Sequence, residues 1–259
     1  MIDIQKAKHE LKKYVGQYDL EDKRIKLKLA HIQRTASIAK EIAKKLNLKE
    51  EEVKLAELIG LLHDIGRFEQ VKRYGTFIDK NSINHGELGI QILFEEGIIR
   101  NFVEDRQYDE IIKKAILNHN KGKKDLSFSN EREELHSKII RDADKTDIIY
   151  IFTFEEKQVV WEKADFSKEK MTDEIYREFI EEKEIKYQER RTAVDLLVSH
   201  FCFIYDFNYN YGLQIIKQKN YMKKIYNRFK FEDKKTEDRM KHIYKKIEEY
   251  LESKKETSK

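Results

Sequence analysis

The scarcity of helix-breaking residues constrains the fold of this chain most: none of its 259 residues is proline and only 9 are glycine. Both residue types interrupt helices, so their scarcity favours helices and leaves weak signals for strands. Hydrophobic residues make up 39% of the chain, with 14 Phe and 14 Tyr, which is enough apolar surface for a sizeable core although 39% of residues are charged. We therefore expect a folded, all-α protein.

Apolar residues recur at helical spacing in several segments. Between residues 25 and 46 they stand three or four positions apart, beginning with Ile25, Leu29 and Ile32, which is the period of an amphipathic helix. Comparable patterns predict helices over residues 49–64, 83–94, 108–117 and 131–154. We expect the second helix to break near Gly66, with a polar connection before the third.

Histidine and aspartate occupy selected places in these helices. His31 lies within the first helix, His63 and Asp64 stand together at the end of the second, and Asp144 interrupts the apolar pattern of the last. Side chains from facing helices can meet in the core of a bundle. Neutral imidazole nitrogens and carboxylate oxygens suit zinc, manganese, iron or magnesium, so these residues are candidate metal ligands.

The order of these residues resembles the HD-domain superfamily of metal-dependent phosphohydrolases. The resemblance is carried by Ala30-His31, by Leu61-Leu62-His63-Asp64-Ile65-Gly66, and by Arg141-Asp142-Ala143-Asp144-Lys145. Residues 63–66 fit the best-known signature of the superfamily letter for letter. The resemblance implies an HD-type bundle of about five core helices over residues 1–164. A charge-rich helical extension would then follow over residues 165–259.

The same resemblance implies four metal ligands: His31, His63, Asp64 and Asp144. Asp142 is the rival for the last place. A helical offset of two residues turns side chains by about 200°, so Asp142 and Asp144 cannot share one face. We prefer Asp144 because it follows a small residue and precedes a basic one, as the terminal aspartate of the superfamily usually does.

Two further histidines, His85 and His119, lie between the doublet and the last aspartate. In the superfamily such histidines either help to hold a second metal, bridged by the aspartate of the doublet, or contact the substrate or act as acids. Both arrangements stay open here. The cofactor we expect is one or two divalent ions, chosen from Mn, Fe, Zn, Mg and Co.

The chemistry we expect is hydrolysis of a phosphate ester or anhydride. A bound metal lowers the pKa of water, and the hydroxide attacks phosphorus in line with the leaving oxygen. Asp64 would bridge the metals or hold the nucleophile, and His85 or His119 would protonate the leaving group if it is not a ligand. Cationic side chains near these residues would balance the phosphate charge: Arg67, Lys121 and Lys145.

Charge and cysteine content limit the partners. The 53 basic residues are nearly cancelled by 49 acidic ones, so we expect a small phosphorylated substrate such as a nucleotide, and no nucleic acid. The single Cys202 excludes an internal disulfide, no apolar run approaches the roughly 20 residues that span a bilayer, and the first residues lack the pattern of a signal peptide. We expect a cytoplasmic protein whose C-terminal helices cover the cleft or mediate self-association.

Two other functions remain open. A related HD-like group uses the same ligands to activate oxygen, so a diiron oxygenase is one alternative. A regulator that binds metal or nucleotide without turnover is the other. Four histidines lie outside the pattern and receive no role: His9, His136, His200 and His242.

Overall fold

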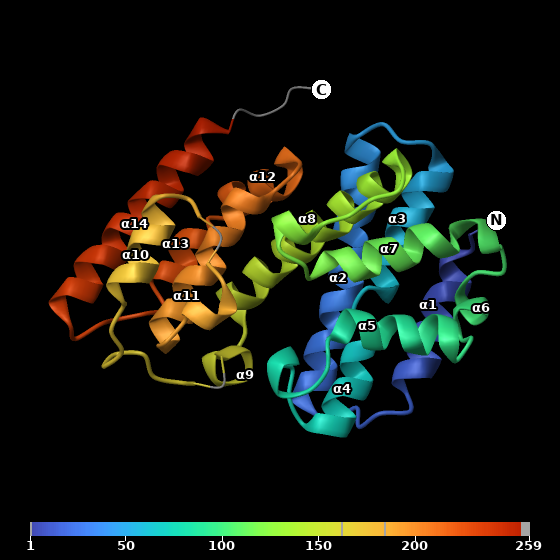
Figure 1. Ribbon diagram of the computed structural model, residues 1–259, viewed down its shortest axis with the longest axis horizontal. Coiled ribbons are helices and arrows are strands. Elements are labelled where there is room, and N and C mark those ends of the chain that lie inside the picture. The colour runs from blue at the N-terminus through green and yellow to red at the C-terminus, as the bar shows by residue number, and fades with distance from the viewer. Residues whose placement is uncertain (1, 162, 184, 255–259) are drawn as a thin grey trace. The chain divides into compact units, whose positions relative to one another are not determined.

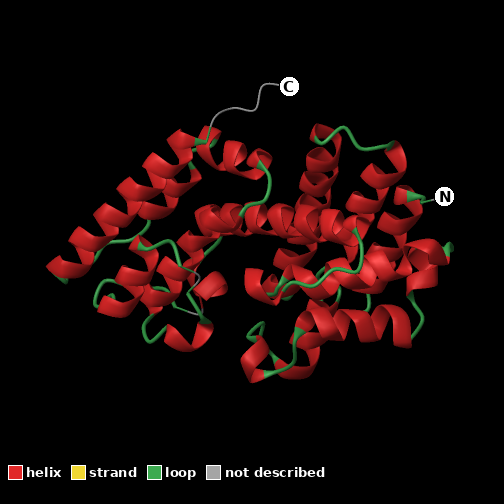
Figure 2. Ribbon diagram, turned by 45° about the horizontal axis from the view of Figure 1, so that its top comes forward, coloured by secondary structure: helices red, strands yellow, loops and turns green. Residues whose placement is uncertain are grey.

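The computed structural model describes residues 2–161, 163–183 and 185–254. In these residues all regular elements are helices, joined by loops, and no strand is formed (Figure 2). The predicted all-α class is therefore confirmed. None of the helices in this part of the chain combines the length and the apolar character needed to span a bilayer.

The chain forms two compact units, Met1–Asp147 and Ile148–Lys259. The division falls inside one long helix, whose residues 131–147 belong to the first unit and whose residues 148–154 belong to the second. The domain limits expected from the sequence, 1–164 and 165–259, stay a prediction.

The first unit holds every residue to which the sequence assigns a role. The helices over 25–46, 49–64, 83–94, 108–117 and 131–154 are present as α2, α3, α5 with η2, α7 and α8 (Figure 1). The short elements are η1 (Asp79–Asn81), η3 (Arg106–Tyr108), η4 (Lys123–Asp125) and the π-helical turn η2 (Gln91–Glu95). The α-helices of the first unit are α1 (Ile4–Val15), α2 (Lys23–Lys45), α3 (Glu50–Leu62), α4 (Gly66–Tyr74), α5 (His85–Ile90), α6 (Ile99–Phe102), α7 (Asp109–His119) and the first part of α8 (Glu131–Phe154).

Helix α4 begins where the sequence predicts a break. His63 and Asp64 form a short turn after α3, and Gly66 is the first residue of α4 rather than the start of a polar connection. Ile65, Phe68 and Val71 stand three residues apart along this segment and are all buried. This apolar stripe explains the helix, which turns the chain back over the core at the point where the doublet stands.

Glycines allow neighbouring helices of the first unit to approach closely. A Cβ on Gly60 of α3 would lie 2.5 Å from the Cα of Ala36 in α2. A Cβ on Gly66 would lie 2.7 Å from the backbone nitrogen of Gly89 in α5, and it would collide with the carbonyl oxygen of His85. Because real Cβ contacts are longer, these two glycines allow α3 to approach α2, and α4 to approach α5, more closely than a larger residue would.

The second unit has an aromatic core. Trp161, Phe166 and Phe229 pack edge to face, and the ring of Phe152 stacks on that of Trp161. Asp195 joins two segments because its carboxylate accepts hydrogen bonds from Thr172 and from Thr192. The helices are α9 (Lys157–Trp161), α10 (Asp173–Ile180), α11 (Ala193–Phe201), α12 (Asn210–Gln218), α13 (Tyr221–Tyr226) and α14 (Lys234–Ser253), with η5 (Tyr187–Glu189) and η6 (Cys202–Asp206) between them.

The approach of α4 to α5 predicts that Gly66→Ala destabilises the protein. The methyl group meets backbone atoms, which move only together with a whole helix, so we expect a loss of about 1–3 kcal/mol in the free energy of unfolding. Urea unfolding followed by circular dichroism measures it. Gly89→Ala is the matched control: its methyl group meets neighbours at ordinary distances of 3.6–3.8 Å, so stability should stay equal or rise. Equal stability of Gly66→Ala and the wild type would contradict the close approach.

The link between α3 and α8 predicts a pH-dependent contribution to stability. His136 Nε2 lies 2.7 Å from Glu52 Oε2, and Arg132 Nε donates to the same carboxylate at 3.1 Å. The hydrogen bond from His136 lowers the pKa of Glu52, and burial acts in the opposite direction. Arg132 lowers this pKa further, so that the pKa of Glu52 is about 2. Since this value is below the ordinary 4.5, the contribution is complete above about pH 4.5 and is lost as the pH falls towards 2.

Glu52→Gln should therefore destabilise the protein by roughly 1–2 kcal/mol at pH 7, and by less at pH 3. Urea unfolding at both pH values gives the difference. Glu50→Gln, at an exposed position of the same helix, serves as the control. A destabilisation of the same size at pH 7 and pH 3 would show that the carboxylate charge is not responsible.

Candidate metal centre

Six of the predicted residues meet in the first unit. Each lies within a helix or at its end, and each is at most 9% exposed. Their positions follow the helices: His31 is within α2, His63 and Asp64 follow α3, His85 opens α5, His119 ends α7 and Asp144 is on α8. Asn84 fixes the start of α5, because its side chain accepts hydrogen bonds from the backbone N–H groups of Gly86 and Glu87.

The two carboxylate oxygens of Asp64 face different pairs of histidines. Oδ2 lies 3.4 Å from Nε2 of His31 and 3.7 Å from Nε2 of His63. Oδ1 lies 3.4 Å from Nε2 of His85 and 3.6 Å from Nε2 of His119. One carboxylate therefore stands between two groups of imidazoles, which is the position of a bridging ligand.

Asp144 completes the first of these groups. Its Oδ1 lies 3.1 Å from Nε2 of His31 and 3.6 Å from Nε2 of His63. Within the described residues, three sets of three side chains place one ligand atom each within 4.8 Å of one another: His31 with His63 and Asp64, His63 with His119 and Asp144, and Asp64 with His85 and His119. Asp142, the rival of Asp144, is buried but belongs to none of these sets.

Hydrogen bonds at Nδ1 orient all four imidazoles in the same sense. His63 Nδ1 donates to the carbonyl of Gly60 at 2.9 Å, and His119 Nδ1 donates to that of Ile116 at 2.5 Å. His31 Nδ1 lies 2.7 Å from a carboxylate oxygen of Asp147, and His85 Nδ1 lies 2.6 Å from one of Asp79. An acceptor at Nδ1 places the proton there, so the lone pair of each neutral ring is at Nε2.

The inward-facing nitrogens fit a cation better than they fit one another. Nε2 of His85 and of His119 are 2.9 Å apart, although in the tautomers just assigned neither carries a proton. In the described part of the chain, Nε2 of His31 and of His63 has no hydrogen-bond partner and is fully buried. Buried polar atoms without partners are costly, and a divalent ion accepts lone pairs from all of them. The residues present thus fit a metal ion.

Electrostatics favours ionised carboxylates and, on two of the rings, neutral imidazoles. Burial disfavours the charged form of Asp64, but Lys28 and the imidazoles outweigh burial and hold the pKa of Asp64 well below its usual range. Burial likewise opposes the charge of Asp144, but His31 and His63 hold the pKa of Asp144 well below its usual range. Burial lowers the pKa of His63, and it lowers that of His85 to about 3. For His31 burial and Lys28 are outweighed by Asp144, Asp147 and Asp64, which raise the pKa to about 10.

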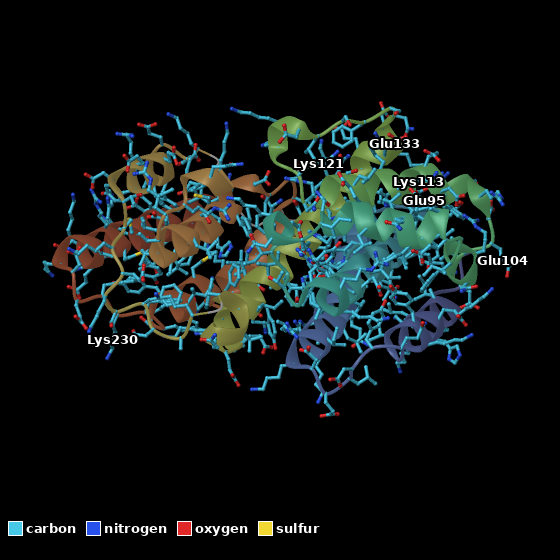
Figure 3. All side chains as sticks on the ribbon, turned by 60° about the horizontal axis from the view of Figure 1, so that its bottom comes forward. Glu95, Glu104, Lys113, Lys121, Glu133 and Lys230 are labelled. Carbon is cyan, nitrogen blue, oxygen red and sulfur yellow. The ribbon has the colours of Figure 1, made fainter. Side chains whose placement is uncertain are left out.

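The three predicted cationic residues lie in different surroundings. Arg67 is at the cluster: its Nε lies 3.6 Å from Asp64 Oδ1, and its Nη1 donates to Asp79 at 2.8 Å. Lys121 is half-buried in the loop between α7 and η4 (Figure 3), and no ion pair of its ammonium group is found among the described residues. Lys145 is buried on α8, next to Asp144, and leaves the helix about 100° away from it.

Three residues at the cluster have no predicted role. Lys28 donates to Asp64 Oδ2 at 2.7 Å. Asp147 accepts the hydrogen bond of His31 Nδ1, and Asp79 accepts that of His85 Nδ1. Two of them carry a signal in the sequence: Lys28 precedes His31 by three residues, and Asp147 follows Asp144 by three, so each shares a helix face with a predicted ligand. Asp79 lies in η1, outside the periodic segments, and has no such signal.

Comparison with known proteins identifies the segment that carries the cluster. A family model for the HD domain matches residues 29–149, which include all six residues of the cluster. No curated protein and no solved structure matches the chain. The matched family belongs to a superfamily of metal-dependent hydrolases, which agrees with the resemblance based on residues 63–66.

The contact between Asp147 and His31 predicts an effect on metal binding. Asp147→Asn removes the charge that holds the ring at Nδ1, so we expect the affinity for Mn²⁺ to fall about 10- to 100-fold. Isothermal titration calorimetry on the purified protein measures it. Asp109→Asn is the control, since Asp109 pairs with Arg100 at the start of α7, about 15 Å along the helix from His119. Unchanged affinity in Asp147→Asn would exclude this role.

Proposed function

We propose that the HD domain formed by residues 29–149 is a metal-dependent phosphohydrolase that cleaves a phosphate ester or anhydride of a nucleotide or a related small molecule. The single observation that supports this most is the arrangement around Asp64, where four imidazole nitrogens and two carboxylates face one another, and where Nε2 of His31 and of His63 has no hydrogen-bond partner among the described residues. Such a donor set has one ordinary use in proteins, which is to hold divalent cations.

The donor set supports two ions per chain. Asp64 Oδ2 with His31, His63 and Asp144 would hold one, and Asp64 Oδ1 with His85 and His119 would hold the other. Divalent ions in these positions supply a hydroxide nucleophile near neutral pH and neutralise charge on the phosphate. The four nitrogen ligands favour Mn, Fe, Zn or Co over Mg, which prefers oxygen ligands and retains several waters.

The protein's own side chains prepare this site. Hydrogen bonds at Nδ1 keep the rings fixed, so that little reorganisation is needed when charge develops on the phosphate. Arg67 is anchored by Asp79, which also holds His85, and places a cation beside Asp64. Since the pKa of His85 is about 3, this ring is unprotonated at neutral pH and serves as a ligand rather than as a proton donor.

The proposal predicts hydrolysis that depends on Asp64. With Mn²⁺ present, the purified protein should release phosphate or a nucleotide from at least one of three classes: nucleotides, dinucleoside polyphosphates and cyclic dinucleotides. Asp64→Ala should lower kcat/KM at least roughly 100-fold, because both groups of ligands lose the carboxylate that they share. His242→Ala, at an exposed position of the second unit, is the control and should retain full activity.

Three outcomes separate this function from its alternatives. Absence of turnover with metal bound would contradict the phosphohydrolase and favour a regulator that binds without reacting. Oxygen uptake by the reduced iron form with an organic substrate would favour an oxygenase. Phosphate release that is supported equally by redox-inert zinc would exclude the oxygenase and support hydrolysis.

A further inference from the structure

Lys28 makes the shortest contact with Asp64 that the structure shows. Its ammonium group donates to Oδ2 at 2.7 Å, and only 14% of the side chain is exposed. Lys28 stands one turn before His31 on α2, so the ammonium reaches Asp64 from the face that carries the first histidine. This lysine lies just outside the segment that the HD family model matches.

The contact uses an oxygen that a metal would need. Oδ2 of Asp64 also faces Nε2 of His31 and of His63, at 3.4 and 3.7 Å. An ammonium group and a divalent ion on the same oxygen repel each other strongly at this depth. Lys28 and a metal in the first group of ligands therefore compete for the negative charge of Asp64.

A second cation lies near Lys28, on the same aromatic ring. Its Nζ lies 5.4 Å from the centre of the Phe77 ring, and the guanidinium of Arg67 lies 5.7 Å from the same ring. Nε of Arg67 is buried and has no hydrogen-bond partner among the described residues, although Asp64 Oδ1 is 3.6 Å away. Two cations on one aromatic ring, one with an unused N–H, are a suitable pair for the oxygens of a phosphate group.

We propose that Lys28 occupies the place of a metal ion on Asp64, and that its ammonium group moves from Asp64 to the phosphate of the substrate when metal binds. The inference rests on the proposed function, since it names the group that binds the phosphate at that site. It also explains why a lysine is placed against a carboxylate that faces four imidazoles: the positive charge balances Asp64 in the metal-free protein and remains available for an anion.

Two binding measurements test this with Lys28→Met. Without phosphate, the variant should bind Mn²⁺ about tenfold more tightly than the wild type, because no ammonium group competes for Asp64. After saturation with Mn²⁺, it should bind inorganic phosphate about tenfold more weakly, because the cation that receives the anion is gone. Isothermal titration calorimetry measures both affinities. The opposite signs are decisive, since a merely structural role of Lys28 would weaken both.

Matched variants complete the test. Lys28→Arg keeps the charge and should behave like the wild type in both titrations, whereas Lys28→Gln should repeat the two signs of Lys28→Met. Lys26→Met removes a lysine of α2 that is exposed and paired with Glu21, so neither affinity should change. Thermal melts of all four variants establish that they are folded.

The role of Lys28 is overturned if Lys28→Met binds Mn²⁺ no more tightly than the wild type, or if it binds phosphate equally well. Neither titration requires turnover, so the result is independent of the assay of the proposed function. A wild type that binds Mn²⁺ but cleaves no phosphate compound contradicts the proposed hydrolysis. The pair of opposite shifts, found in that same protein, would still support the displacement of Lys28.

Discussion

The buried carboxylate of Asp64 is the group on which the arrangement of the first unit depends. It is 2% exposed, and an ion removed from water to this extent needs compensating charges and hydrogen-bond donors. These come from distant parts of the chain, because α2 brings Lys28 and His31, the starts of α4 and α5 bring Arg67 and His85, and the end of α7 brings His119. Close approach of the backbones at Gly60 and Gly66 brings α2 to α3 and α4 to α5. Packing and charge thus require the same geometry, and a change in either affects the site.

The four imidazoles are held in two ways, and the difference follows from where each stands. His63 and His119 are at the ends of α3 and α7, where backbone carbonyls lack helical partners, and each ring donates to the carbonyl three residues earlier. Local structure is sufficient to orient them. His31 is in the middle of α2 and His85 at the start of α5, where no free carbonyl is at hand, so carboxylates of η1 and α8 hold them. Their orientation therefore depends on tertiary structure.

This difference also decides how far the sequence predicts the site. Helical periodicity predicted α2, α3, α7 and α8, and the turn of about 200° between positions two apart correctly separated Asp144 from Asp142 in space. The break near Gly66 was predicted correctly, since α3 ends at Leu62 and residues 63–65 form a turn, but the polar connection expected after it is in fact the helix α4. Asp79 was out of reach, since its partners Arg67 and His85 meet it across loops whose course no periodicity describes. The six residues of the cluster were thus predictable from the motif and the intervening histidines, and the groups that orient and balance them only in part.

Positive and negative side chains are paired around the cluster. Three of the four carboxylates have a cation of their own: Lys28 pairs with Asp64, Arg34 with Asp147, and Arg67 with Asp79. The fourth, Asp144, lies 3.1 Å from Nε2 of His31, and its carboxylate helps to raise the pKa of that ring. Each of these four carboxylates thus faces a basic side chain. In the proposed function, metal binding at Asp64 is therefore coupled to the movement of a charge that the protein itself supplies, the ammonium group of Lys28.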